Sequence, residues 1–236
     1  MEKIIHRADS RGVAEHGWLS SRHTFSFANY YNPERMSFGK LRVLNDDVVD
    51  PAGGFGTHSH DNMEIVSVPL SGALRHQDSM GNKHVIQHGE VQIMSAGTGL
   101  SHSEYNNSDI ERVNFLQIWV LPKEQNIQPC YGQLAFDPAD HHNEFQLVVS
   151  PEKNNETVWI NQEAYFSLGD FEQHQTGHYT VRQSGHGIYL FVIDGAVEVA
   201  GETLNKRDAI GIVNTNELTV RALDNSQLLI IEVPMY

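Results

Sequence analysis

Residues 65–95 read IVSVPLSGALRHQDSMGNKHVIQHGEVQIMS, a stretch typical of short strands separated by turns. Apolar runs at Ile65–Leu70, Ala73–Gln77, His84–Gln87 and Val91–Ser95 alternate with polar and glycine-containing breaks. Strand-length runs that recur every 8 to 12 residues or so predict an all-β sandwich or barrel. No long apolar pattern with a helical period competes with this one, so we expect little helix.

The same rhythm extends outward and then repeats. Leu41–Leu44 and Val113–Leu121 complete a first series of runs, with a break expected at residues 45–47. A proline-flanked segment, Pro122–Pro129, separates it from a second series between residues 145 and 233. Residues 66–73 align with residues 189–196, and residues 89–93 with residues 207–211. These observations predict two antiparallel β-barrels in tandem, residues 1–135 and residues 136–236.

Charge and composition exclude several classes of protein. The chain has 16 Lys and Arg against 30 Asp and Glu, a net charge of -14. Nucleic acid and anionic membranes both require clustered basic residues, so neither is an expected direct partner. No apolar stretch approaches the length of a membrane span, and Met1–His6 lacks an apolar signal region. A single cysteine, Cys130, excludes an internal disulfide and fits a cytoplasmic protein.

Two motifs in the first series carry potential metal ligands. Residues 53–64 read GGFGTHSHDNME, and residues 97–106 read GTGLSHSEYN. On a strand, residues i and i+2 point to the same face, so His58 projects with His60 and His102 projects with Glu104. If the two strands are neighbours facing the barrel interior, three imidazoles and one carboxylate converge. Such a set suits Fe, Mn, Ni, Cu or Zn and leaves one or two coordination positions open.

The second series lacks the same constellation. In the alignment of the two halves, Val181 corresponds to His58 and Gln183 to His60. No histidine follows His186. The metal site is therefore expected in the first barrel alone. A His-x-His pair by itself means little, because random placement of 14 histidines gives about 0.8 such pairs. The eleven other histidines receive no assigned role.

The motifs resemble those of a known superfamily. The run from His58 to Glu64, and the later glycine-rich turn with His102 and Asn106, look like the two cupin motifs. Further segments make the chain similar to the pirin family, and within it to bacterial pirin-like quercetin 2,3-dioxygenases: Phe25–Ala28, Arg42–Asp47 and Gln92–Gly99. The resemblance implies a bicupin of jelly-roll type. It also implies one divalent metal in the N-terminal barrel, Fe(II) in preference to Zn, Ni, Cu or Mn, bound by His58, His60, His102 and Glu104.

The resemblance also implies an activity. It suggests a dioxygenase that uses O2 to cleave the heterocyclic ring of a flavonol such as quercetin, with release of CO. Glu104 is the expected base, because a carboxylate beside a metal can accept a substrate proton. Phe115 and Trp119 are candidates for the lining of an apolar substrate pocket, although aromatic residues on strands more often belong to the core. Glu64 is a candidate for a position behind the metal ligands. Asp61-Asn62-Met63 stands where many pirins carry Arg-Gly-Phe, which alters the mouth of the pocket.

Two other functions remain open from the sequence. One is a metal- or redox-sensing module that binds a protein partner, since some pirins are implicated in regulation through protein contacts. The other is a different cupin enzyme, such as an isomerase of a small polar substrate. We expect a monomer, because two barrels in one chain can cover each other as two subunits would.

Overall fold

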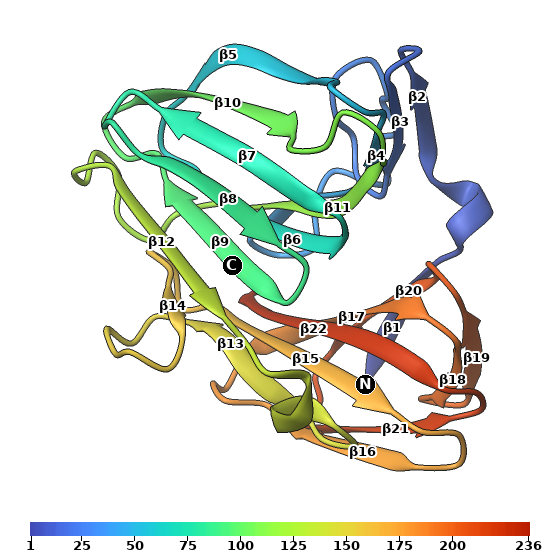
Figure 1. Ribbon diagram of the computed structural model, residues 1–236. Helices are drawn as coiled ribbons and strands as arrows, with labels where there is room; N and C mark the ends of the chain where they lie inside the picture. Colours follow the sequence, from blue (N-terminus) through green and yellow to red (C-terminus); the bar gives the residue numbers. More distant parts are fainter.

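The computed structural model describes residues 1–236 as two β-barrels in tandem (Figure 1). Each barrel consists of one seven-stranded sheet and one four-stranded sheet. The only helices are two 3₁₀ turns, η1 (Ala8–Ser10) and η2 (Pro138–His141). All strand pairs are antiparallel except one parallel pair at the end of the second large sheet. The expected all-β bicupin with little helix is confirmed. No helix is long and apolar enough to cross a membrane.

The first barrel contains most of the N-terminal half of the chain. Its seven-stranded sheet has, in spatial order, β12 (Cys130–Ala135), β9 (Glu90–Ser95), β6 (Glu64–Ser71), β11 (Val113–Val120), β4 (Leu41–Val49), β3 (Leu19–His23) and β2 (Gly12–Glu15). Its four-stranded sheet has β5 (Gly54–His60), β10 (Leu100–Asn106), β7 (Ala73–Asp78) and β8 (Lys83–Gln87).

The second barrel repeats this order. Its large sheet has β1 (Glu2–His6), β20 (Ala209–Val213), β17 (His186–Asp194), β22 (Ser226–Pro234), β15 (Tyr165–Phe171), β13 (Gln146–Ser150) and β14 (Val158–Trp159). Its small sheet has β16 (Thr176–Thr180), β21 (Glu217–Ala222), β18 (Ala196–Val199) and β19 (Glu202–Asn205). Strand β6 corresponds to β17 and strand β9 to β20, as the sequence alignment of the two halves predicts.

The division between the barrels differs from the expected one at the N-terminus. Strand β1 lies at the edge of the second barrel's large sheet, where it pairs with β20 from Glu2↔Val213 to His6↔Ala209. In the first barrel, β12 covers the corresponding edge beside β9. Residues 2–6 therefore belong structurally to the second barrel. Pairing covers an edge strand that would otherwise expose unpaired backbone groups, and short-range patterns cannot reveal such a long-range partner.

The expected break at residues 45–47 is also wrong, because β4 continues through it. Asp46 faces the second barrel. Its carboxylate accepts a hydrogen bond of 2.8 Å from Asn114 on β11. It also lies 3.6 Å from Arg11 and 3.5 Å from Arg207. Asp47 points the other way and is buried. Consecutive acidic residues in a sequence are typical of a turn. In the fold, contacts with Asn114, Arg11 and Arg207 offset the cost of burying Asp46.

The two large sheets pack against each other through an apolar core. It comprises 25 buried residues from both barrels, among them Leu44, Leu116, Phe166 and Phe191. Successive side chains of the strands that supply this core point to opposite faces of the sheet. Every second side chain therefore points into the interior of its own barrel. The core between the barrels thus fixes which residues of β4, β6 and β11 face the first barrel's interior.

The interiors of the two barrels differ sharply in polarity. The second contains one cluster of 15 buried apolar residues, and its buried polar side chains include Ser167, His186 and Glu232. The first holds two small apolar clusters, of six and four residues, with polar side chains between them. The buried polar side chains of the first barrel include Asp47, Ser67, Gln92, His102 and Glu104. Since burying polar groups is costly without partners or a ligand, this contrast points to a site in the first barrel.

Candidate metal centre

Strands β5 and β10 are neighbours, and this pairing brings the three expected histidines together. His102 lies directly opposite His58, and Leu100 lies opposite His60. The Nε2 atom of His102 is 3.0 Å from Nε2 of His60 and 3.0 Å from Nε2 of His58. A β-bulge follows, with Glu104 opposite Phe55, and bulges commonly redirect side chains beside functional sites.

The three ring nitrogens are spaced as metal ligands require. Two ligand atoms about 2.1 Å from a metal and at right angles to each other lie about 3.0 Å apart. The observed 3.0 Å spacings from His102 to His58 and to His60 match that arrangement. The Nδ1 atom of His58 lies 2.8 Å from the carbonyl oxygen of Gly56, which accepts its hydrogen. That bond leaves the lone pair on Nε2, the nitrogen that faces the other two rings.

Burial favours the neutral form of two imidazoles in this cluster, those of His60 and His102. It lowers the pKa of His60 to about 4, and the neighbouring His102 and His58 lower it further in the same sense. Burial likewise lowers the pKa of His102 to about 3, with smaller contributions from His58 and His76. Neutral imidazoles have the free lone pair that a metal needs. The donor set fits a divalent transition metal.

Glu104 lies deeper in the barrel than the imidazole cluster. Its side chain is buried. One carboxylate oxygen of Glu104 and one ring nitrogen each of His76 and His102 all lie within 4.8 Å of one another. The carboxylate accepts a hydrogen bond of 2.7 Å from Nε2 of Gln117 and one of 3.2 Å from the hydroxyl of Ser67. His58, His60 and His102 form a separate group within the same distance, so His102 belongs to both.

Sequence reasoning missed His76 and its partners on β7. His76 is fully buried directly opposite Glu104, and its Nε2 atom lies 3.1 Å from a carboxylate oxygen of Asp78. Its Nδ1 atom is buried without a partner. The ring of Tyr131 packs 5.1 Å from that of His76 and stacks on His84. The signal was present, because His76 and Asp78 share the i, i+2 spacing of the two motifs.

The aromatic residues expected to line a pocket fall in different places. The indole of Trp119 packs edge-on against His60 at 5.0 Å and against Phe27 at 5.2 Å. Its Nε1 atom is buried without a hydrogen-bond partner. Phe115, by contrast, is fully buried in the apolar cluster with Val49. Trp119 thus forms a wall of the metal centre, whereas Phe115 belongs to the barrel core.

Glu64 does not stand behind the metal ligands. It faces the second barrel, where its carboxylate accepts hydrogen bonds of 2.6 Å from the hydroxyl of Ser95 and 3.0 Å from the backbone N–H of Asn161. The expectation assumed one continuous strand from His60 to Glu64. The chain instead bends between β5 and β6, with Asn62 at a φ of 46°, so the alternation of faces does not carry across.

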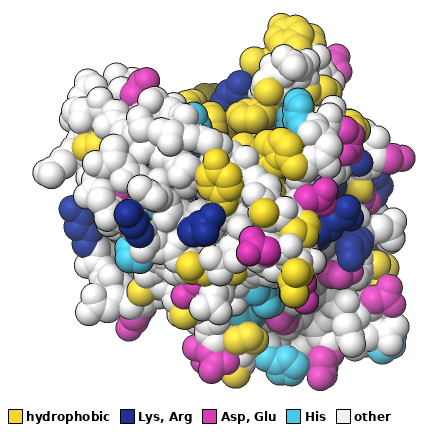
Figure 2. Space-filling model, turned by 45° about the horizontal axis from the view of Figure 1, so that its top comes forward, with side chains coloured by type: hydrophobic (Ala, Val, Ile, Leu, Met, Phe, Trp, Pro, Cys, Tyr) yellow, Lys and Arg dark blue, Asp and Glu magenta, His cyan; other side chains and the backbone are white.

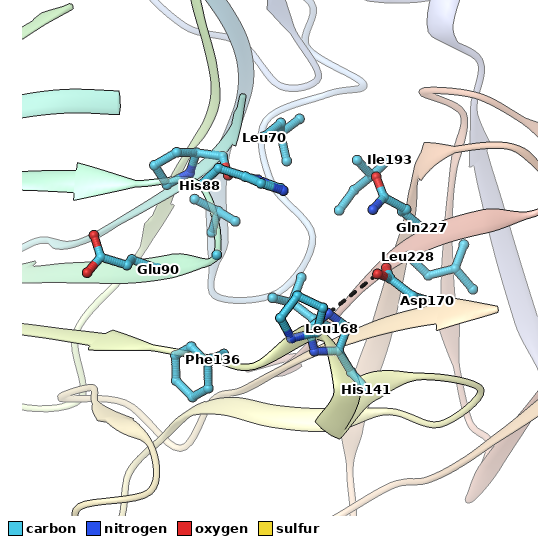
Figure 3. A pocket seen from close by; sticks show the side chains of 14 residues that line it. Leu70, His88, Glu90, Phe136, His141, Leu168, Asp170, Ile193, Gln227 and Leu228 are labelled. Carbon is cyan, nitrogen blue, oxygen red and sulfur yellow. Dashed lines mark hydrogen bonds and ion pairs between the residues drawn. The ribbon is translucent and has the colours of Figure 1, made fainter. Parts of the chain in front are cut away.

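The end of the molecule that bears β5 and β10 has a mixed surface. Figure 2 turns this end toward the viewer and shows hydrophobic side chains grouped beside a histidine on its upper part. A separate hollow lies between the two barrels (Figure 3). Leu70 and His88 line it from the first barrel, and Asp170, paired with His141, from the second and the connection. None of the metal-centre residues lines this hollow.

Models of known protein families match both halves of the chain. The family model described as Pirin matches residues 6–120, and the model described as "Quercetinase C-terminal cupin domain" matches residues 147–233. A protein of Escherichia coli K12 named quercetin 2,3-dioxygenase is 42% identical over 236 residues, covering 98% of each chain.

Solved structures agree with the sequence matches. The crystal structure of YhhW from E. coli aligns with a TM-score of 0.95 at 39% identity, covering 100% of this chain and 99% of that one. A second structure, of bacterial pirin YhhW in complex with nickel(II), aligns with a TM-score of 0.94 at 38% identity and covers 100% of both chains.

Proposed function

Because this chain belongs to the pirin family, we propose that it is a metal-dependent dioxygenase that cleaves the heterocyclic ring of a flavonol such as quercetin with O2 and releases CO. The observation that carries the proposal is the convergence of the Nε2 atoms of His58, His60 and His102 at 3.0 Å spacings, with Glu104 beside them in a polar barrel. The name of the E. coli relative supports the activity, and the nickel complex of YhhW supports a divalent metal. Among metals we favour Fe(II).

The imidazoles, Glu104 and Trp119 have separate roles in this reaction. When bound, the metal supplies Lewis acidity and a template for the two substrates. The imidazoles of His58, His60 and His102 would hold the metal, and burial favours the neutral form of His60 and His102. Glu104 is the group placed to accept the proton of the flavonol 3-hydroxyl at a carboxylate oxygen. The indole of Trp119 offers an apolar wall, and its unpartnered Nε1–H can donate to a substrate oxygen.

The test compares metal-loaded protein with matched variants. The apoprotein is loaded separately with Fe(II), Ni(II), Mn(II), Cu(II) or Zn(II), and O2 uptake and CO release are measured with a flavonol panel. We expect stoichiometric O2 consumption and CO release with at least one metal, and loss of both in Glu104→Gln despite retained metal. A native protein that holds its metal but consumes no O2 with any flavonol would exclude the proposed reaction.

A further inference from the structure

A closed set of hydrogen bonds joins Glu104 to two polar residues that no motif includes. Gln117 on β11 donates from Nε2 to Oε2 of Glu104 at 2.7 Å. The hydroxyl of Ser67 on β6 lies 3.2 Å from Oε1 of Glu104 and 3.2 Å from Oε1 of Gln117. All three side chains are buried. A serine hydroxyl has one hydrogen, so Ser67 can donate to only one of these two acceptors at a time.

The second barrel offers an internal comparison. Ser67 pairs with Gln117 across β6 and β11, and the corresponding pair across β17 and β22 is Leu190 with Ile230. Glu104 pairs with His76 across β10 and β7, and the corresponding pair across β21 and β18 is Val220 with Val199. The four counterparts, Leu190, Ile230, Val220 and Val199, all belong to the apolar cluster of the second barrel.

The second barrel shows whether the fold needs polar residues at the positions of Ser67 and Gln117. At the four corresponding positions the second barrel has apolar side chains, so the fold itself does not require Ser67 or Gln117. Buried polar side chains cost free energy unless they are paired. Ser67 and Gln117 occupy positions that are apolar in the second barrel, and their hydrogen bonds to Glu104 connect them to the candidate metal centre.

We propose that Gln117, anchored by Ser67, is a positioning residue that holds Oε2 of Glu104 away from the metal, so that Glu104 reaches the metal through Oε1 alone. With Oε1 of Glu104 at a bound metal, Ser67 would donate its hydrogen to Oε1 of Gln117, which would keep the amide in place. A carboxylate bound through one oxygen leaves a coordination position open. This inference rests on the metal centre of the proposed function and is independent of the flavonol.

The test uses Co(II)-loaded protein, because Co(II) absorption bands report coordination without turnover. Gln117→Met removes the donor with little change in shape. We expect altered Co(II) bands and a Co(II) dissociation constant raised about 10–100-fold, as for other residues that orient metal ligands. Gln92→Met is the matched control, since Gln92 is also buried in the same barrel and makes no hydrogen bond to Glu104. It should match the native protein.

A double-mutant cycle distinguishes positioning from packing. In a Glu104→Gln background the further change Gln117→Met should leave the bands and the dissociation constant unchanged. An effect of the same size in that background, or native Co(II) binding by Gln117→Met, overturns the inference. If Gln117→Met does not fold, Ser67→Ala should change the bands in the same direction by a smaller amount, and native bands in that variant count against the inference. Absence of O2 uptake with flavonols would contradict the proposed reaction alone.

Discussion

His58 and His102 are direct cross-strand partners whose Nε2 atoms lie 3.0 Å apart. Side chains opposite each other on neighbouring strands share a face of the sheet, so this pairing alone directs both rings to one point. His60 joins them because it lies two residues from His58 on the same strand. Strand geometry thus holds the three candidate ligands together, and such pre-organisation would lower the cost of binding a metal.

Loss of one of these rings should abolish metal binding. We expect His102→Ala to lower the metal content from about one ion per chain to near zero, as removal of a ligand from a pre-organised set requires. His178→Ala is the matched control, because His178 is exposed on β16, the strand that occupies the place of β5 in the second barrel. Elemental analysis of protein purified without chelator measures both. Native metal content in His102→Ala would contradict the assignment of the site.

Trp119 and Phe115 should differ in what their loss affects. Trp119→Ala removes a wall beside His60, and we expect KM for a flavonol to rise about tenfold with metal content unchanged. Phe115→Ala opens a cavity in the apolar cluster with Val49, and we expect the free energy of unfolding to fall by about 3–5 kcal/mol. Steady-state kinetics and urea titrations check the two outcomes. Equal effects on KM would contradict the separate roles.

Glu64 should affect the contact between the barrels and leave the metal centre intact. Glu64→Leu removes the acceptor for Ser95 and for the N–H of Asn161, and we expect a loss of about 1–3 kcal/mol in the free energy of unfolding. Metal content should stay native. Glu217→Leu, at an exposed position on β21, is the control for the general effect of replacing a glutamate. Metal loss in Glu64→Leu would restore the role expected from the sequence.

Asp47 should make the metal-free protein less stable as the pH rises. Burial raises the pKa of Asp47 to about 7 from an ordinary value of 3.8, with Asp46 and Glu104 adding to the rise and the Ser21 hydroxyl opposing it. The folded state therefore favours the protonated carboxyl. The destabilisation is small below about pH 4, grows as the pH rises, and is complete above about pH 7, where it reaches on the order of 4 kcal/mol.

The variant Asp47→Asn isolates this effect. Asparagine resembles the protonated acid and cannot ionise, so the variant should be more stable than the native protein at pH 8.5 and similar to it at pH 4. Urea titrations of chelator-treated protein at both pH values give the difference. The same stability difference at both pH values would show that Asp47 does not ionise in the way its burial requires.

Local sequence patterns are enough to predict the class of fold and the residue types of the candidate metal site. Turns at short intervals identify strands, and the alignment of residues 66–73 with residues 189–196 identifies the repeat. The i, i+2 spacing of His58 with His60 fixes which rings share a face, because alternation along a strand is a local property. The absence of such residues in the second half predicts one metal site, in the first barrel.

Features that depend on pairing between distant segments become visible in the three-dimensional fold and not in local sequence patterns. The edge position of β1 beside β20 and the continuation of β4 through Asp46 and Asp47 rest on partners far away in the chain. The bend between β5 and β6 reversed the face of Glu64. Gln117 and Ser67 show no motif, because each is an isolated polar residue in an apolar run. Their contact with Glu104 exists only because three strands meet in one barrel, and pairing of distant strands leaves no short-range pattern in the sequence.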